Sequence, residues 1–258
     1  MNTDAARADL LRSLHVPGDP LIVTNVWDAA SARAVASAAG VQALATASHS
    51  ISEARGVPDG EGLTVDEALD AAGIIVRAVD LPVSVDFERG YSPDAAGVEA
   101  NARRLAETGA AGLNIEDSLD GSTMRALAEQ VERVAAVRAG GDAAGVPLVI
   151  NARVDALRRG ETIDEAIGRA NAYLAAGGDV AFMLGLDTAD LVARAVAEID
   201  GPVSVIAKAG YLPLAQLADL GIARVSFGNG PHSLTLHHLT ATAEVLTARG
   251  EYPAELKL

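Results

Sequence analysis

Acidic side chains end two short runs of apolar and β-branched residues, and their spacing suits a divalent cation. Asp86 and Glu88 lie two residues apart in the run 83–88, so on an extended strand they point to the same side. Glu116 ends the next such run, 112–117. A hard ion such as Mg²⁺ takes oxygen ligands and keeps several waters, and it offsets the cost of burying carboxylates. We expect a Mg²⁺ site here; the alternative is that each acid caps a helix or pairs with an arginine.

Composition excludes several classes of protein. The 258 residues are 50% hydrophobic, carry a formal net charge of −15 and contain no cysteine. The negative charge argues against non-specific binding to nucleic acid or to anionic membranes. The absence of cysteine excludes disulfides, thiolate metal sites and a cysteine nucleophile. We find no signal-peptide pattern and no apolar run long enough to span a bilayer, so we expect a cytoplasmic protein.

The order of the predicted elements indicates the fold class. Eight strand-like runs alternate with helical segments; the strands are predicted at 21–26, 41–48, 82–88, 112–117, 147–155, 180–184, 202–207 and 224–228. This pattern predicts an α/β fold, a (β/α)₈ TIM-type barrel that occupies residues 1–258 as a single domain. A doubly wound open sheet is the competitor, but the first βα turn, 25–28, has no glycine-rich phosphate fingerprint. A loop is predicted at 49–62. Barrel chemistry belongs at the strand carboxyl ends, where these acids fall.

Five motifs, in order along the chain, resemble the isocitrate lyase/phosphoenolpyruvate mutase superfamily. They are Asn25-Val26-Trp27-Asp28-Ala29-Ala30-Ser31-Ala32, Pro58-Asp59-Gly60, Val85-Asp86-Phe87-Glu88-Arg89-Gly90-Tyr91, Gly112-Leu113-Asn114-Ile115-Glu116-Asp117-Ser118 and Ile150-Asn151-Ala152-Arg153-Val154-Asp155. The resemblance implies a (β/α)₈ barrel whose last helix is often swapped between subunits, in a homodimer or homotetramer. It also implies chemistry on 2-oxo or 2-hydroxy carboxylates through Mg²⁺-stabilised enolates, with Mn²⁺ as the alternative metal.

The resemblance also assigns roles to single residues. It implies that Asp86 ligates the metal directly and that Glu88, Glu116 and Asp59 hold it through water. It implies that Arg153 binds the substrate carboxylate, that Trp27 packs over the bound acid, and that the turn Ala47-Ser48-His49 contacts the substrate.

One part of the family pattern is missing. Lyase members carry a Lys-Arg/Lys-Cys-Gly-His signature after the fourth strand, whereas residues 118–125 here read Ser-Leu-Asp-Gly-Ser-Thr-Met-Arg. Decarboxylation needs no general base, because loss of CO₂ itself leaves the enolate. We therefore expect a Mg²⁺-dependent C–C lyase or decarboxylase acting on a small 2-oxo or 2-hydroxy dicarboxylate such as oxaloacetate. The alternatives are a phosphonopyruvate C–P hydrolase or mutase-like enzyme, and a non-catalytic metabolite-binding barrel.

Three further residues are candidates for proton transfer or covalent chemistry. His49 ends the second predicted strand and His232 follows the eighth, so either ring could exchange a proton with substrate; a loop or surface histidine is the alternative for each. Lys208 ends the seventh predicted strand and could form a Schiff base with a keto acid, although an exposed turn lysine is the simpler interpretation.

Overall fold

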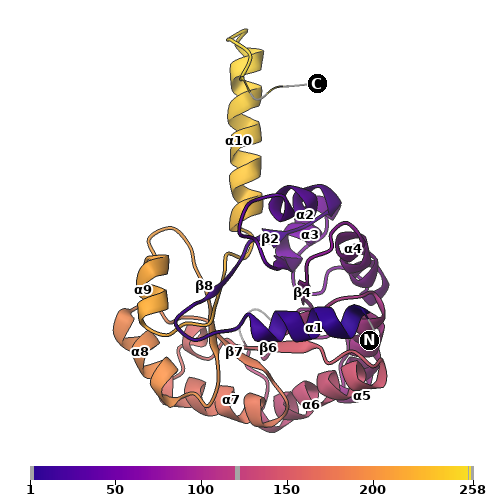
Figure 1. The fold of residues 1–258 in the computed structure, drawn as a ribbon, viewed down its shortest axis with the longest axis vertical. Coiled ribbons are helices and arrows are strands. Elements are labelled where there is room, and N and C mark those ends of the chain that lie inside the picture. Colours follow the sequence, from indigo (N-terminus) through magenta and orange to yellow (C-terminus); the bar gives the residue numbers. More distant parts are fainter. Residues whose placement is uncertain (1–2, 120–122, 255, 257–258) are drawn as a thin grey trace.

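The chain folds as a parallel β-barrel surrounded by helices (Figure 1). The computed structural model describes residues 3–119, 123–254 and 256. Its strands are β1 (Leu21–Val23), β2 (Asn25–Val26), β3 (Leu44–Thr46), β4 (Val83–Asp86), β5 (Gly112–Glu116), β6 (Val149–Val154), β7 (Val180–Met183), β8 (Val203–Ile206) and β9 (Arg224–Ser226). Every paired strand is parallel, in the order β1-β9-β8-β7-β6-β5-β4-β3-β2.

The barrel prediction is confirmed, with one difference at the first strand. The predicted run 21–26 is interrupted at Thr24, so that β1 pairs with β9 while β2 pairs with β3. These two short strands are consecutive in the chain and lie at opposite ends of the pairing order, which is what closes a sheet into a barrel.

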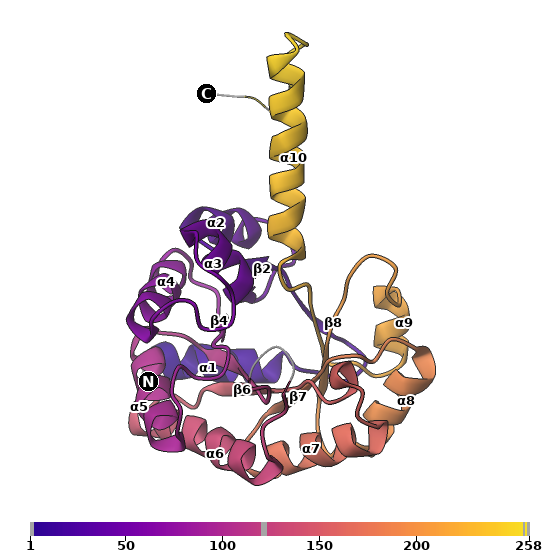
Figure 2. The ribbon, with the colours of Figure 1, turned by 180° about the vertical axis from the view of Figure 1, so that it is seen from behind.

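Helices follow the strands and form the outer ring (Figure 2). They are α1 (Thr3–Ser13), α2 (Ala29–Ala36), α3 (Ser48–Arg55), α4 (Val65–Arg77), α5 (Ala95–Glu107), α6 (Leu127–Ala143), a 3-10 turn (Leu157–Arg159), α7 (Ile163–Ala175), α8 (Ala189–Glu198), α9 (Leu214–Asp219) and α10 (Gly230–Thr247). Local sequence starts several of them: Thr64 and Glu67 form a capping box on α4, and Thr162 and Glu165 form one on α7.

The predicted loop 49–62 is wrong over its first half. Residues 48–55 form α3, in which Ser50, Ile51 and Ser52 are buried. The segment Ser-His-Ser-Ile-Ser-Glu-Ala-Arg is rich in serine, which is a weak helix former. Helix propensity therefore did not predict a helix here. Burial against the barrel and the contact of Ser48 with Asp86 hold this helix, and both depend on residues distant in the sequence.

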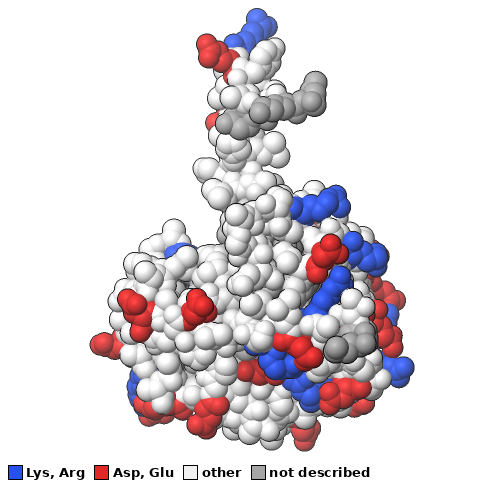
Figure 3. All heavy atoms as spheres, in the orientation of Figure 1, with Lys and Arg blue, Asp and Glu red and all other residues white. Residues whose placement is uncertain are grey.

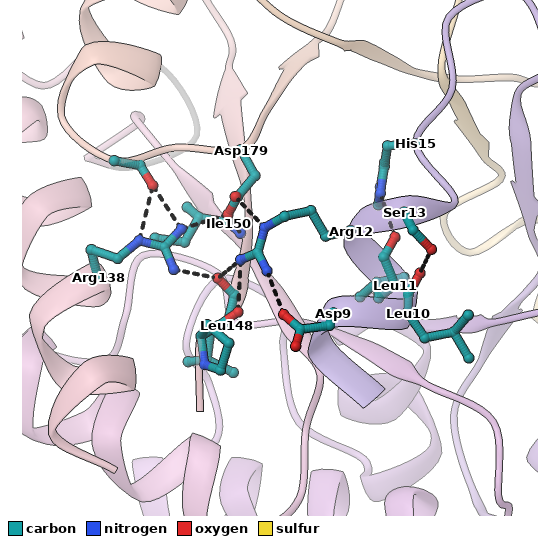
Figure 4. Close-up of polar contacts among 12 residues, drawn as sticks. Asp9, Leu10, Leu11, Arg12, Ser13, His15, Arg138, Leu148, Ile150 and Asp179 are labelled. Atoms are coloured by element: carbon teal, nitrogen blue, oxygen red, sulfur yellow. Dashed lines mark hydrogen bonds and ion pairs between the residues drawn. The ribbon is translucent and has the colours of Figure 1, made fainter. Parts of the chain in front are cut away.

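Helix α1 is fastened to the amino-terminal ends of β6 and β7 by a charged network (Figure 4). Asp179 accepts from Arg12 Nε at 2.9 Å, from Arg138 Nη2 at 2.5 Å and from the amide of Ile150 at 2.8 Å. Arg12 also donates to the carbonyl of Pro147 at 2.8 Å. One carboxylate thus ties α1, α6 and two strands together at the end of the barrel opposite the acidic cluster.

Helix α10 projects from the barrel instead of packing on it (Figure 1). Only His232, in its first turn, is buried, while Leu234 is 73% exposed and Leu239 is 62% exposed. Glu244 is the one acidic or basic residue of α10 apart from its histidines, and the projecting helix carries no charge over most of its length (Figure 3). An exposed apolar helix of this size calls for a covering surface.

Within the described residues, no helix is both long enough and apolar enough to cross a membrane.

Candidate active site

Asp86 is held at the carboxyl end of β4 by the turn that follows β3. Its Oδ2 accepts from the amide of Ser48 at 3.1 Å and from the Ser48 hydroxyl at 2.8 Å. Its own amide donates to the Thr46 hydroxyl at 2.8 Å. Ser48 is the first residue of α3, so the partial positive charge of a helix amino terminus also faces this carboxylate. No described residue donates to Oδ1 in this arrangement, which leaves that oxygen available to a ligand.

Glu88 lies beside Asp86 in a left-handed backbone conformation, with φ of 46°. Its two oxygens accept from the Tyr91 hydroxyl and from the amide of Glu61, each at 2.5 Å. Glu61 and Tyr91 are left-handed too, at φ of 63° and 53°. Three non-glycine residues in this conformation around one carboxylate mark a locally strained segment of the kind found at functional sites. Sequence reasoning missed Glu61, because no local pattern shows that residue 61 folds against residue 88.

Arg153 is engaged by two acids. Its Nη1 lies 2.6 Å from Glu116 Oε2, while Nε and Nη2 lie 3.0 Å from the two oxygens of Asp155. Residues 116 and 153 are register partners on β5 and β6, which explains why these side chains meet. Although burial alone would lower it, Glu116 and Asp155 raise the pKa of Arg153 above its usual value. The guanidinium predicted to bind a substrate carboxylate is therefore fully charged but already paired.

The acids at this end of the barrel repel one another. Burial raises the pKa of Glu88 to about 7, and the negative charges of Asp86 and Asp59 add to the rise. Burial likewise raises the pKa of Glu116 to about 7; Arg153 opposes the shift, and Asp86 reinforces it. Buried carboxylates with raised pKa values form a set that a bound cation would stabilise in the ionised form.

The geometry of this set fits a cation held largely through water. Within the described ranges, no three acid or histidine side chains stand close enough together to ligate one ion directly. Mg²⁺ commonly binds through one or two carboxylates and retains several waters, so it does not require such a cluster. In such a site Asp86, whose Oδ1 accepts from no described residue, would be the direct contact. Glu88 and Glu116, which lie close enough to Asp86 to feel its charge, would accept from metal-bound water.

The two predicted histidines are brought together by a residue that the sequence did not indicate. Glu53 Oε2 lies 3.3 Å from His232 Nδ1 and 3.9 Å from His49 Nε2. His49 Nδ1 in turn lies 3.4 Å from Asp59, and the His232 ring packs on Trp27 with centroids 4.6 Å apart. Glu53 is four residues after His49 on α3, a spacing that would have been informative had a helix been predicted there.

Two of the three amides in the turn Ala47-Ser48-His49, which is predicted to contact substrate, already have acceptors. The amide of Ala47 donates to the carbonyl of Val26 at 3.2 Å, and that of Ser48 donates to Asp86. Ser48 therefore lies against Asp86, and a substrate that bound these two amides would have to share or displace their hydrogen bonds. The role of this turn in binding remains a prediction.

Comparisons with known proteins show the family to which the chain belongs. Residues 11–247 match the model of the family described as phosphoenolpyruvate phosphomutase. The chain is 30% identical over 264 residues to an oxaloacetate decarboxylase of Bradyrhizobium sp., covering 99% of this chain and 90% of that protein. It is 31% identical over 204 residues to a 2-methylisocitrate lyase of Halalkalibacterium halodurans, covering 76% and 66%. A Burkholderia cenocepacia structure solved as a candidate phosphonomutase aligns with a TM-score of 0.89 at 38% identity, covering 96% of this chain and all of that one. The family predicted from the motifs is confirmed.

Proposed function

Since this chain belongs to the phosphoenolpyruvate phosphomutase family, within the isocitrate lyase/phosphoenolpyruvate mutase superfamily of lyases and mutases, we propose a specific activity for it. It is a Mg²⁺-dependent C–C lyase or decarboxylase that acts on a small 2-oxo or 2-hydroxy dicarboxylate, with oxaloacetate as the model substrate. The observation that carries the proposal is the juxtaposition of Asp86, Glu88 and Glu116 with Arg153 at the carboxyl ends of β4 to β6. Residues 1–258 act as one catalytic domain in this proposal.

Asp86, with Glu88, Glu116 and Asp59 around it, would hold the metal, Mg²⁺ or alternatively Mn²⁺. When bound, the ion supplies a Lewis acid that stabilises negative charge on the 2-oxo oxygen as the C–C bond breaks. Hydrogen bonds from Ser48 and Tyr91 fix two of these carboxylates in place before substrate arrives. The protein therefore contributes a preorganised negative site.

The remaining side chains bind substrate and move a proton. Arg153 would orient the substrate carboxylate by exchanging one of its present ion pairs for the substrate. Trp27, with the ring of the buried His232 packed against it, would cover one side of the substrate. His232 Nδ1 faces Glu53, so Nε2 is the atom from which a proton would pass to the product carbon. His49 Nε2 faces the same glutamate, so His49 would exchange protons with His232 through Glu53.

A panel assay tests the activity. Oxaloacetate, phosphonopyruvate and larger 2-hydroxy diacids are incubated with the protein and Mg²⁺. Pyruvate is coupled to lactate dehydrogenase, and other products are identified by mass spectrometry. We expect pyruvate and CO₂ from oxaloacetate at a rate above that of Mg²⁺ alone. Turnover of phosphonopyruvate alone would replace the proposal with C–P chemistry, a second candidate favoured by the likeness to the Burkholderia cenocepacia structure. A folded protein that turns over none of these acids would refute both.

We also propose that α10 is covered by a second copy of the chain, in a homodimer or homotetramer. The support is the exposure of Leu234 and Leu239 on a helix with a single charged residue. Size-exclusion chromatography with light scattering should give at least a dimer for the natural chain. Leu239→Glu should shift the mass downward, whereas Leu10→Glu, at an exposed leucine on α1, should not. A monomeric natural chain at micromolar concentration would contradict this assembly.

A further inference from the structure

A diacid presents two anionic groups, and the site described so far provides for one of them. Three Arg153 nitrogens already face Glu116 and Asp155 at 2.6 to 3.0 Å. Arg153 can therefore give up one pairing to a single carboxylate, but a second anion needs another cation. In a protein with 35 acidic and 20 basic residues, a cation left without an acidic partner near the barrel mouth is informative.

Two such cations line one cavity that lies beyond the carboxyl ends of β6 to β9, at the same end of the barrel as the acidic cluster. The cavity has a volume of about 1220 Å³, and Arg158 and Lys208 contribute to its wall. Neither forms an ion pair with another described residue, and Asp187 is the one carboxylate among the described residues that line it. Apolar side chains such as Leu184, Phe227 and Leu234 supply most of the remaining surface. A mostly apolar pocket with a few charged groups is the usual form of a small-molecule site.

Lys208 and Arg158 follow the carboxyl ends of two strands, at the end of the barrel that carries the acidic cluster. Lys208 is the second residue after β8, and Arg158 lies in the 3-10 turn after β6, the strand that carries Arg153. Both residues are exposed, and both contribute to the wall of the same cavity. Asp86 ends β4 at this same mouth, where the chemistry of such a barrel takes place.

We propose that Lys208 and Arg158 form a subsite for the distal anionic group, carboxylate or phosphonate, of a substrate whose 2-oxo acid end lies between Asp86 and Arg153. This inference rests on the proposed function and narrows its substrate class to 2-oxo acids with a second anionic group. Lys208 offers a compact charge on a flexible stem, and Arg158 offers a planar fork that suits either anion. The two residues determine specificity and take no part in bond breaking.

Calorimetric titration with Mg²⁺ present tests the subsite separately from turnover. The probes are D,L-malate, its phosphonate counterpart 2-hydroxy-3-phosphonopropionate, and D,L-lactate, which lacks the distal anion. None has the keto group from which decarboxylation starts. We expect malate or the phosphonate to bind at least 10-fold more tightly than lactate, and the tighter of the two identifies the distal group. Lys208→Met and Arg158→Met should each lower the affinity for that ligand about 10- to 100-fold, the effect of losing a charged hydrogen bond, and should leave the affinity for lactate unchanged.

Two variants provide controls of opposite kinds. Arg33→Met removes an exposed cation on α2 that does not line the cavity, and it should change no affinity. Asp187→Asn removes the negative charge that competes for the two cations, so it should increase the affinity for the diacid. Equal binding of all three probes by the natural protein, or unchanged diacid affinity in both Lys208→Met and Arg158→Met, would overturn the subsite. Selective diacid binding without any turnover in the panel assay would retain the subsite and refute the lyase proposal. Oxaloacetate turnover with an unchanged KM in both Lys208→Met and Arg158→Met would retain the lyase proposal and refute the subsite.

Discussion

Asp86→Asn is expected to lower kcat/KM for oxaloacetate by about 1000-fold or more, because it removes the carboxylate that we propose as the direct ligand of the metal. The asparagine carbonyl can still accept from the amide and hydroxyl of Ser48, so the fold should persist. The coupled pyruvate assay at saturating Mg²⁺ gives the rate, and circular dichroism with a urea titration checks the fold.

The matched control for this change is Asp66→Asn. Asp66 is an exposed acid in the first turn of α4, and its side chain pairs with Arg104 on α5. It should retain the natural rate. An Asp86→Asn protein that keeps more than a tenth of the natural kcat/KM would show that the metal is held elsewhere, or that the reaction does not need it.

Arg153→Met is expected to destabilise the fold by about 3–5 kcal/mol, in addition to removing the predicted carboxylate contact. Asp155 is fully buried and Glu116 nearly so, and both lose their counter-charge while they remain in a low-dielectric environment. Breaking a buried ion pair from one side is costly because the remaining charge must be neutralised or hydrated. Urea unfolding, with the midpoint and slope compared with those of the natural chain, measures the loss.

Arg194→Met is the comparison for this second prediction. Arg194 also bridges two acids, Asp164 and Glu198, but all three side chains are exposed, and water replaces such contacts readily. Its unfolding midpoint should hardly move. If Arg153→Met shifts the midpoint no more than Arg194→Met does, the buried network would be structurally dispensable, and Arg153 would be free to serve substrate alone.

The sequence was most informative about the fold, the family and the acids at the strand ends. Eight β-then-α units and five ordered motifs predicted the barrel and its family, and both predictions were correct. The same motifs indicated Asp86, Glu88 and Glu116 because acids at the ends of apolar strands are rare without a purpose. The structure brings these three together, which is the part of the site that strand order alone can position.

The positions of residues that depend on tertiary contacts could not be predicted from the sequence. Glu61 meets Glu88 through a left-handed turn, and Glu53 joins two histidines only because residues 48–55 form a helix. Pairing with an arginine was the alternative interpretation for each acid, and Glu116 does pair with Arg153, which also pairs with Asp155. The sequence gives the residue types at strand ends but not which arginine neutralises which acid. Long-range packing decides all three.

The most direct test of the central claim is removal and return of the metal. The natural protein is treated with excess EDTA, dialysed, and assayed for pyruvate release from oxaloacetate before and after Mg²⁺ is restored, with the rate of Mg²⁺ alone subtracted. The carboxylate cluster around Asp86 predicts that turnover disappears with EDTA and returns with Mg²⁺ in the natural chain, and does not return in Asp86→Asn. Turnover that continues unchanged in excess EDTA would contradict a metal-dependent reaction at this site.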